Sequence, residues 1–236
     1  MIDLHMHLLP GIDDGPDTME QSLEMLRKVK SEGIDAIVAT SHCGFAPGPR
    51  LKKTLEILRE AAAREGLALP LYLGCEVACS PGRMEDILQA LSTGEYPTLN
   101  GTRYVLTEFS PFAVPMGARK CLEQLLAAGY IPIIAHAERS LYLAEAEGFY
   151  REMRRLGCRI QCNVYSFAQE SKPEIRAAAR QLLTEELVDV LGTDAHRPNH
   201  RPPQAAIGLS WLRAHTRADY FRAITEENAR SFLGLA

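Results

Sequence analysis

The sequence predicts an α/β fold, a series of parallel βα units that closes into a barrel, in a single domain of residues 1–236. Short apolar runs alternate with longer segments of helical period up to about residue 195, which is the pattern of βαβ units. The first run is followed by His5-Met6-His7, whereas an open doubly wound sheet typically has a glycine-rich phosphate-binding turn there. A barrel is therefore favoured over an open sheet.

Seven apolar runs have the length expected of buried strands, and helical segments lie between them. These runs are residues 2–4, 34–39, 69–73, 104–106, 131–135, 159–162 and 188–191. Because helices separate the runs, the strands are expected to be parallel and their carboxyl ends to lie on one face of the barrel.

Capping signals predict where several helices begin and end. Asp17-Thr-Met-Glu20 is a capping-box pattern with Asp17 as the N-cap candidate, and Gly33 is expected to end that helix. The other signals are the N-cap pair Ser80-Pro81, the terminating residues Gly129 and Gly157, and Thr225-Glu-Glu-Asn228, which is expected to open the last helix.

Composition narrows the class of partner. The chain has 26 Lys and Arg residues against 30 Asp and Glu residues, so no excess of positive charge indicates nucleic-acid binding. No run approaches the roughly 20 apolar residues that span a bilayer. The amino terminus opens into Met1-Ile2-Asp3 without a signal-peptide pattern. We therefore expect a cytoplasmic protein without membrane insertion, acting on a small or protein-borne group.

The six cysteines are too dilute for a disulfide scaffold, and none forms a Cys-x-x-Cys pair. We expect all of them to be reduced and mostly buried, as small apolar residues. Cysteine-dependent phosphatases need an arginine six residues after the nucleophile, but Pro49 stands there after Cys43, and Arg50 is one place too late. A covalent thiol mechanism is therefore not expected.

Imidazole and carboxylate residues follow nearly every predicted strand. In a barrel these positions converge on one pocket, and this mixture of ligands suits manganese, iron or zinc better than magnesium. The residues are His5, His7, His42, Glu76, Glu108, His136, Asp194 and His196, with Asn163 after the sixth strand. The pairs His5-x-His7 and Asp194-x-His196 can each direct two ligands to one side, because alternate residues of an extended chain share a face.

Structural explanations remain open for several of these residues taken alone. His42 can be a loop histidine and His136 a satisfied core group, while Glu76 and Glu108 can be ion-paired carboxylates. Asp13-Asp14-Gly15-Pro16 can be a plain turn, although one of its two acids can reach a metal. The histidines at positions 200 and 215 follow no strand and are interpreted as surface residues.

Two arginines are expected on the same face as the ligands. Arg139 follows His136 by three residues, and Arg201 follows His196 by five. A guanidinium group can bind a phosphate with two parallel hydrogen bonds, although a solvated loop arginine is the alternative for each. A metal cluster flanked by two arginines suggests a phosphate ester as the substrate.

Several segments together resemble a known family. They are Met-Ile-Asp-Leu-His-Met-His at 1–7, Asp-Asp-Gly-Pro at 13–16, Thr-Ser-His at 40–42, Gly-Cys-Glu at 74–76, Tyr-Pro-Thr-Leu-Asn at 96–100, Glu-Phe-Ser at 108–110, Ile-Ala-His-Ala-Glu-Arg at 134–139, and Thr-Asp-Ala-His with Arg-Pro-Pro at 193–203. Over essentially its whole length the chain resembles the bacterial manganese-dependent tyrosine phosphatases of the polymerase-and-histidinol-phosphatase (PHP) superfamily. Those enzymes act with tyrosine autokinases in capsule and exopolysaccharide synthesis.

The resemblance implies a distorted, seven-stranded, TIM-like (β/α)7 barrel with two or three metal ions. Manganese is expected, with iron or zinc as alternatives. By position, it implies one metal held by His5, His7, Glu76 and Asp194, a second by Glu76, Glu108 and His136, and a third by Asp14, His42 and His196. Arg139 and Arg201 would hold the phosphate, and His42 and His196 would join them as catalytic residues.

The expected function is that of a metal-dependent phosphoric monoester hydrolase that removes phosphate from tyrosines of a bacterial autokinase. Water activated by the metals would attack phosphorus in line, without a phosphoenzyme. A PHP phosphatase of a small metabolite such as histidinol phosphate is the alternative within enzymes. A non-catalytic, metal-stabilised regulator that binds the kinase is the alternative from another class. The loop of residues 43–49 is expected to line the substrate entrance.

Overall fold

The computed structural model describes residues 1–67, 69–110, 117–145 and 148–235. Within these ranges eight short strands form two parallel sheets, in the orders β1-β2-β3 and β4-β5-β6-β7-β8. The strands are β1 (Ile2–Met6), β2 (Ala36–Ala39), β3 (Leu71–Leu73), β4 (Glu76–Ala78), β5 (Tyr104–Glu108), β6 (Ile131–Ile134), β7 (Arg159–Asn163) and β8 (Val190–Gly192).

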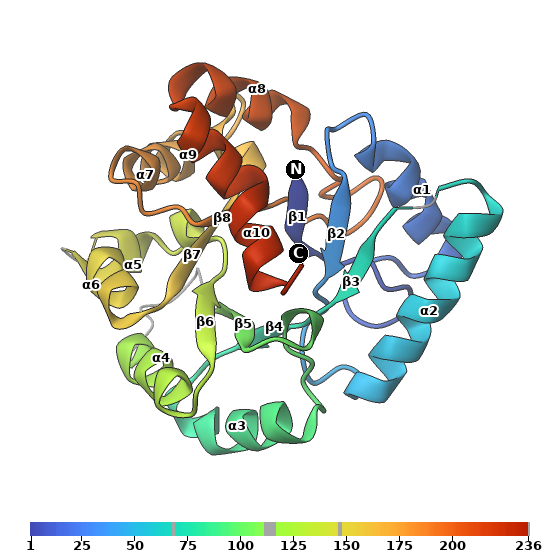
Figure 1. Ribbon diagram of the computed structural model, residues 1–236, viewed down its shortest axis with the longest axis horizontal. Helices are drawn as coiled ribbons and strands as arrows, with labels where there is room; N and C mark the ends of the chain where they lie inside the picture. Colours follow the sequence, from blue (N-terminus) through green and yellow to red (C-terminus); the bar gives the residue numbers. More distant parts are fainter. Residues whose placement is uncertain (68, 111–116, 146–147, 236) are drawn as a thin grey trace.

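The two sheets meet at two seams, so the strands stand in a ring with helices around its outside (Figure 1). At one seam the amide of Asp194 donates to His5 and the amide of His7 donates to Ala195, which joins β1 to the segment after β8. At the other, an isolated parallel bridge joins His42 to Glu76. The predicted barrel-like α/β fold is confirmed, although no continuous ladder of strand pairs crosses either seam within the described ranges.

The strand predicted at residues 69–73 is followed directly by a further strand that was not predicted. β3 pairs with β2, and β4 pairs with β5, so the chain changes sheets between them. Gly74 lies at this change, where a Cβ atom would stand 2.6 Å from Leu99 Cδ2. Glu76 is consequently both the first residue of β4 and a residue just beyond the carboxyl end of β3.

Helices cover the outside of the ring and connect successive strands. Their bounds are α1 (Met19–Val29), α2 (Gly48–Arg64), α3 (Met84–Thr93), α4 (Ala118–Ala127), α5 (Leu141–Glu145), α6 (Phe149–Leu156), α7 (Pro173–Thr184), α8 (Ala206–His215), α9 (Ala218–Arg222) and α10 (Asn228–Phe232). Short 3₁₀ turns lie at Pro81–Arg83, Leu99–Gly101, Ala137–Arg139 and Val164–Phe167, and a π turn at Ala223–Glu227 connects α9 to α10.

Two predicted helix starts need correction. The N-cap of α1 is Thr18 and not Asp17, because the Thr18 hydroxyl accepts from the amide of Gln21, while the Gln21 side chain accepts from the amide of Asp17. The capping box is therefore Thr18-x-x-Gln21. Thr225 opens no helix: it lies inside the π turn and donates its hydroxyl proton to the carbonyl of Phe221.

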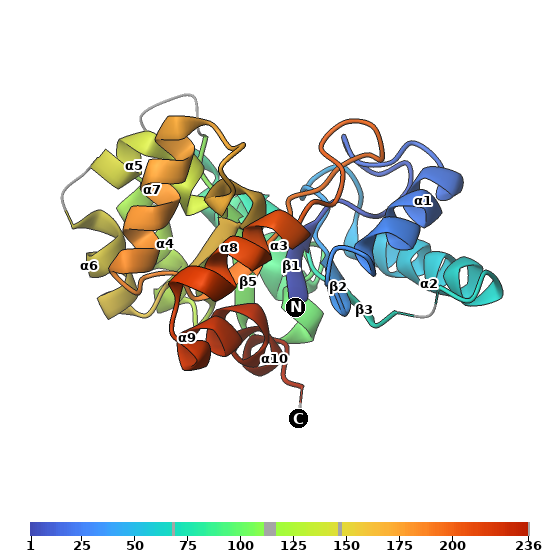
Figure 2. The same cartoon turned by 90° about the horizontal axis from the view of Figure 1, so that it is seen from above.

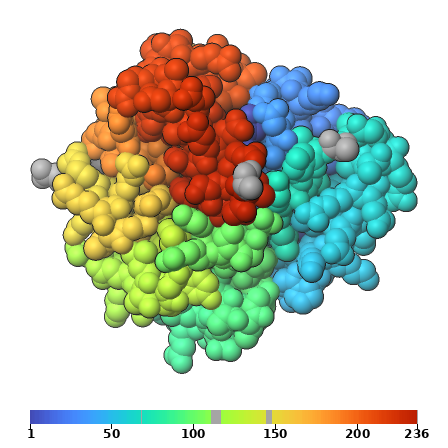
Figure 3. All heavy atoms as spheres, in the orientation of Figure 1, coloured from blue at the N-terminus to red at the C-terminus, as the bar shows by residue number. Residues whose placement is uncertain are grey.

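The C-terminal helices cover the end of the ring at which the strands begin. Phe232 of α10 stacks on Tyr104 at the start of β5, with ring centroids 4.4 Å apart, and the Asn100 side chain donates to the carbonyl of Leu233. Figure 2 shows α9, α10 and both termini at this end, and in Figure 3 the C-terminal segment fills the centre of the face. The carboxyl ends of the strands therefore face the opposite side.

The cysteine prediction is wrong for two of the six residues. Cys43 and Cys75 form a disulfide, with Cα atoms 5.8 Å apart, whereas Cys79, Cys121, Cys158 and Cys162 are free. A spacing of 32 residues gives no sign of this pairing; it arises because the segments after β2 and before β4 lie side by side at a seam. None of the helices within the described ranges is both long and apolar enough to cross a bilayer.

Candidate active site

All of the predicted ligand residues come together at the carboxyl ends of the strands. Here the structure has a cavity of about 450 Å³. Its walls are formed by Asp14, His42, Glu76, Ala78, Cys79, Ser80, Arg83, Glu108, Ser110, His136, Arg139, Asp194, His196 and Arg201. His5 and His7 lie fully buried beneath it and contact Glu76 and Asp194.

Three acceptor atoms point at one position at the bottom of the site. The Nε2 atoms of His5 and His7 are 3.3 Å apart, and Glu76 Oε2 lies 3.2 Å from the first and 3.3 Å from the second. Nδ1 of His5 faces the side-chain oxygen of Gln161 at 3.2 Å, and Nδ1 of His7 faces Asp13 at 2.8 Å. Because these partners accept the Nδ1 protons, the lone pairs of both Nε2 atoms face the Glu76 carboxylate. Such an arrangement requires a cation or extra protons between the three atoms.

The electrostatics of the buried groups agree with this reading. Burial would raise the pKa of Glu76, but the neighbouring histidines His5, His136 and His7 hold it well below its ordinary value. Burial would lower the pKa of His7, but its bonds with Asp13 and Glu76 raise it to about 10. The carboxylate is thus ionised and draws positive charge into the cluster, where a bound cation can replace the imidazole protons.

Within the described residues, three groups of side chains each bring their ligand atoms within 4.8 Å of one another. The first is the trio of His5, His7 and Glu76. The second is His42, Glu76 and Glu108, and the third is His7, Asp14, His42 and His196.

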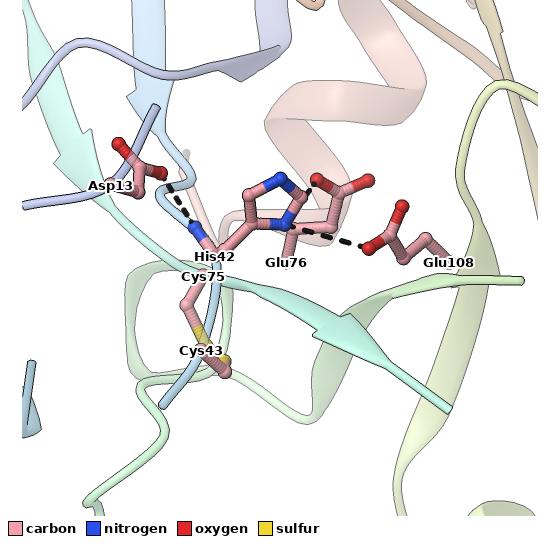
Figure 4. Close-up of a disulfide and its surroundings, with 6 residues drawn as sticks. All are labelled: Asp13, His42, Cys43, Cys75, Glu76 and Glu108. Atoms are coloured by element: carbon pink, nitrogen blue, oxygen red, sulfur yellow. Dashed lines mark hydrogen bonds and ion pairs between the residues drawn. A yellow bond between two sulfur atoms is a disulfide. The ribbon is translucent and has the colours of Figure 1, made fainter. Parts of the chain in front are cut away.

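His42 stands between the second and third groups, because its two ring nitrogens face different partners. Its Nδ1 lies 3.2 Å from Glu76 and 3.5 Å from Glu108 (Figure 4). Its Nε2 lies 3.7 Å from Asp14. His136 lies beside the second group, with Nε2 3.1 Å from Glu76 Oε1. Its buried Nδ1 has no hydrogen-bond partner among the described residues.

His196 completes the third group. Its Nε2 lies 3.3 Å from Asp14, and its ring stacks on His7 with centroids 3.8 Å apart. Burial and the nearby charges of His7 and Arg201 lower its pKa to about 3, so the ring is neutral at physiological pH. Neutral imidazole is the form that binds a metal.

The two acids of the Asp13-Asp14 turn have different positions. Asp14 faces His42 and His196 from the solvent side, with 61% of its side chain exposed. Asp13 is buried and accepts hydrogen bonds from Nδ1 of His7 and from the amide of His42. Asp14 therefore lies in the site itself, and Asp13 orients two residues of it.

The predicted arginines both reach one buried carboxylate. Arg139 Nη1 lies 2.6 Å from Asp194 Oδ2, and Arg201 contacts the same oxygen through Nη2. A second donor of Arg201 lies 3.1 Å from His196 Nε2. Asp194 directs its other oxygen to the ring nitrogen of His5 at 3.6 Å. Both guanidinium groups thus line the cavity, held by Asp194.

Backbone strain is concentrated at this site. His136, Asp194 and Arg201 have positive φ angles of 32°, 54° and 58°, in a region that residues with a side chain rarely adopt. Such conformations persist where the surrounding structure enforces them, and they often occur in functional sites. In this protein they aim three side chains into one cavity.

The residues of the site that were not singled out from the sequence include Arg83 and Ser110 of the cavity wall and two buried residues that orient the others, Gln161 and Glu138. The side-chain oxygen of Gln161 accepts hydrogen bonds from His5 Nδ1 and from the backbone amide of His136. The side-chain amide of Gln161 donates to Asn163, and the side-chain amide of Asn163 donates to Asp194. Glu138 is buried and accepts from the amide of Asn163 and from the Ser166 hydroxyl. The spacing Gln161-x-Asn163 on β7 is the same as that of His5-x-His7, so both side chains point to the same face of the strand. This spacing is the one feature of the sequence that indicates Gln161 as a site residue.

Comparison with known proteins agrees with the fold. A family model described as capsular polysaccharide synthesis, CpsB/CapC, matches residues 1–234. The tyrosine-protein phosphatase CpsB of Streptococcus pneumoniae is 33% identical over 212 residues, which are 86% of this chain and 86% of that protein. The tyrosine-protein phosphatase YwqE of Bacillus subtilis is 30% identical over 205 residues, 85% of this chain and 79% of that protein.

Solved structures extend the comparison. One structure from the study of YwqE of B. subtilis and CpsB of S. pneumoniae, described as metal-dependent tyrosine phosphatases, superposes with a TM-score of 0.89 at 29% identity, covering 99% of this chain and 94% of that one. A phosphotriesterase homology protein from Escherichia coli has a TM-score of 0.63 at 11% identity over 98% of both chains, and shares the fold alone. The family resemblance inferred from the sequence is confirmed: this chain belongs to the CpsB/CapC family of capsular polysaccharide synthesis proteins.

Proposed function

We propose that this protein is a metal-dependent protein-tyrosine phosphatase that hydrolyses phosphotyrosine on a bacterial tyrosine autokinase. The observation that carries the proposal is the convergence of His5, His7 and Glu76 on one position below a cavity that also contains Arg139 and Arg201. The names of the relatives support the same activity, because those proteins are tyrosine phosphatases of capsule synthesis.

The proposed ligand sets are those implied by the family resemblance. They overlap the three groups of side chains, but add Asp194 to the first, take His136 in place of His42 in the second, and leave His7 out of the third. His5, His7, Glu76 and Asp194 would hold one ion, and Glu76 would bridge to a second ion held with Glu108 and His136. Asp14, His42 and His196 would hold the third. Manganese is proposed, with iron or zinc as alternatives, since imidazole and carboxylate together suit these metals. When bound, the ions would supply an acidified water and neutralise the phosphate oxygens.

The residues around the ions have separate tasks. Gln161 and Asp13 fix the rings of His5 and His7 with Nε2 facing the site. Arg139 and Arg201, anchored on Asp194, are positioned to bind the phosphate and offset the charge that shifts toward the leaving oxygen. That oxygen leaves as a phenolate with a pKa near 10, so protonation matters less than for an alkyl phosphate.

The protein substrate is proposed from the description of the family, and the cellular location from the state of the cysteines. Phosphotyrosine on an autokinase of capsule or exopolysaccharide synthesis is the proposed substrate, because the family model carries that process in its description. The proposed location is the cytoplasm. Four of the six cysteines are free, which supports a reducing compartment, where disulfides are usually transient.

The experiment that tests the function is a comparison of substrates. The manganese-loaded protein is given phosphotyrosine peptides, phosphoserine peptides and histidinol phosphate, and kcat/KM is measured for each. We expect the phosphotyrosine peptides to be the best substrates. A preference for histidinol phosphate would indicate a phosphatase of small metabolites. Tight binding of the peptides without turnover would indicate a regulator that binds the kinase.

A further inference from the structure

The disulfide lies directly beside the candidate metal site. Cys43 follows His42 in the sequence, and Cys75 precedes Glu76, so each sulfur is one residue away from a proposed ligand. Figure 4 shows the disulfide next to the backbone of both segments, with the His42 ring and the Glu76 carboxylate directed toward one another. A covalent bond therefore joins the two segments that carry these ligands.

The disulfide also crosses the weaker part of the fold. The sheets β1-β2-β3 and β4-β5-β6-β7-β8 share no continuous ladder at this seam. The backbone contacts between the two segments include the bonds from the Cys43 amide to Glu76, at 2.9 Å, and from the Glu76 amide to Ser41, at 3.1 Å. At such a seam one added covalent link has a large influence on how closely His42 is held to Glu76.

We propose that Cys43 and Cys75 are a redox modification site, a reversible thiol–disulfide pair whose oxidised form fixes His42 and Glu76 in ligand-holding positions. The reduced form loosens the seam and releases metal faster. The inference rests on the proposed metal-dependent function, since it concerns two of the ligands assigned there. The co-reactant is a low-molecular-weight thiol or its disulfide, such as glutathione in its two oxidation states.

The exchange is balanced as two successive displacements at sulfur. A thiolate attacks Cys43 Sγ, the Cys43–Cys75 bond breaks, and Cys75 leaves as a thiolate that takes a proton from water. A second thiolate attacks the external sulfur of the mixed disulfide and releases Cys43, so two thiols are oxidised and one protein disulfide is reduced. Oxidation is the reverse reaction, with the small disulfide as electron acceptor.

The surroundings select which sulfur is attacked. Cys43 is half-buried, whereas Cys75 is 1% exposed, so an external thiolate reaches only the first. Cys79 lines the nearby cavity but does not compete as a nucleophile, because burial raises the pKa of its thiol to about 12. Cys121, Cys158 and Cys162 are buried and free. The pair thus has one accessible sulfur and one protected leaving group.

The test combines a thiol count with metal release from the holoprotein. Manganese-loaded protein is equilibrated in glutathione buffers of different ratio and quenched with acid, and its thiols are counted after denaturation. We expect four thiols in the oxidised form and six in the reduced form. Metal transfer to an excess of chelator should be roughly tenfold faster from the reduced form, a loss of the size seen when groups that orient ligands are removed.

Matched variants separate this effect from a general loss of stability. The double variant Cys43→Ser with Cys75→Ser should release metal quickly in every buffer, with an unchanged circular dichroism spectrum. Cys79→Ser removes a cysteine that lines the same cavity and should keep the full redox response. The comparison of glutathione buffers uses wild-type protein, so the test does not depend on the double variant being stable.

Two results would overturn the inference. One is six thiols at every glutathione ratio, and the other is equal metal release from both forms, which would make the disulfide a structural link only. Failure of the proposed function has a different signature: redox-dependent metal release without turnover of any phosphate ester would reject the phosphatase and keep the switch. Absence of metal binding would reject both.

Discussion

Arg139 Nη1 lies 2.6 Å from Oδ2 of Asp194, and this ion pair connects the arginines proposed to bind phosphate to the cluster of proposed ligands. Arg201 contacts the same oxygen. The other oxygen of Asp194 faces the ring nitrogens of His5 and His196, at 3.6 and 3.7 Å. One buried carboxylate therefore positions both arginines relative to the proposed metals.

Substitution of Arg201 tests the phosphate-binding role. Arg201→Lys keeps the charge but loses the planar fork, and Arg201→Ala loses both. We expect kcat/KM on a phosphotyrosine peptide to fall in the order wild type, Lys, Ala, with at least about a tenfold loss for Ala, or ~1.4 kcal/mol. Metal analysis accompanies the kinetics, because a loss of metal would assign the effect to Asp194 and His196 instead.

The control for Arg201 is Arg213, which is exposed on α8 over the ring of Phe221. Arg213→Ala should change catalytic free energy by no more than about 0.5 kcal/mol. If Arg201→Ala is as fast as this control, Arg201 does not bind the phosphate.

Glu76→Gln tests the proposed bridging ligand. The substitution preserves the size of the side chain but removes the negative charge that would be shared between two cations, so we expect lower metal content and lower activity together. The measurements are metal stoichiometry after gel filtration and turnover of a phosphotyrosine peptide. Glu123→Gln, at an exposed pair with Arg119 on α4, is the control and should behave as wild type. Full metal content with normal turnover in Glu76→Gln would remove Glu76 from the site.

Asp13→Asn tests the residue that orients His7. The amide keeps an acceptor but loses the charge, and interactions of this kind typically contribute 10- to 100-fold in metal affinity, so a loss of roughly that size is expected. Affinity is measured by competition with a chelator of known strength. Asp219→Asn, on the exposed start of α9, is the control. Equal affinities for the two variants would show that Asp13 has no influence on the metal site.

Chelation and thiol alkylation should have opposite outcomes. Removal of metal is expected to abolish activity and added manganese to restore it. Iodoacetamide is expected to leave the metal-loaded, oxidised enzyme active, because Cys43 and Cys75 are joined, Cys79 has a pKa raised by burial to about 12, and the other three thiols are buried. Complete inactivation of a protein that keeps its metals would indicate a catalytic cysteine instead.

Gly208→Ala is expected to destabilise the fold. A Cβ atom at this position of α8 would collide with the backbone carbonyl of Val164, which follows the site residue Asn163 and cannot move independently. We expect a loss of more than about 2 kcal/mol in the free energy of unfolding, measured with denaturant. Gly82→Ala, where a Cβ atom would meet nothing within 4 Å, is the control and should lie within about 0.5 kcal/mol of wild type.

The convergence of the site residues could be predicted from the sequence, because it follows from the common direction of the strands and from the alternation of side chains along each strand. His5 lies on β1 and His7 just beyond its end, and Glu108 and His136 stand at or just beyond the ends of β5 and β6, as the apolar runs indicate. The type and spacing of these residues can be read directly from the sequence. A parallel order of βα units then brings the carboxyl ends of the strands, and the residues on them, to one face.

Features that depend on contacts between distant segments could not be predicted. The change of sheet at Gly74 depends on the close approach of Leu99, and the disulfide depends on the seam that results from it. From the residues alone the choice between Asp13 and Asp14 stayed open, and only the family resemblance implied Asp14, because the choice depends on which acid the His7 ring meets. The residues that neighbour these positions in the sequence do not indicate which distant segments they will contact.

The seam between Met6 and Ala195 has a consequence for how the protein is made. His5 and His7 are synthesised before Asp194 and His196, but their position beside these residues requires β8 and the loop after it. The complete set of proposed ligands therefore forms only when the ring closes. A site built in this way couples the binding of the proposed metals to the folding of the whole ring.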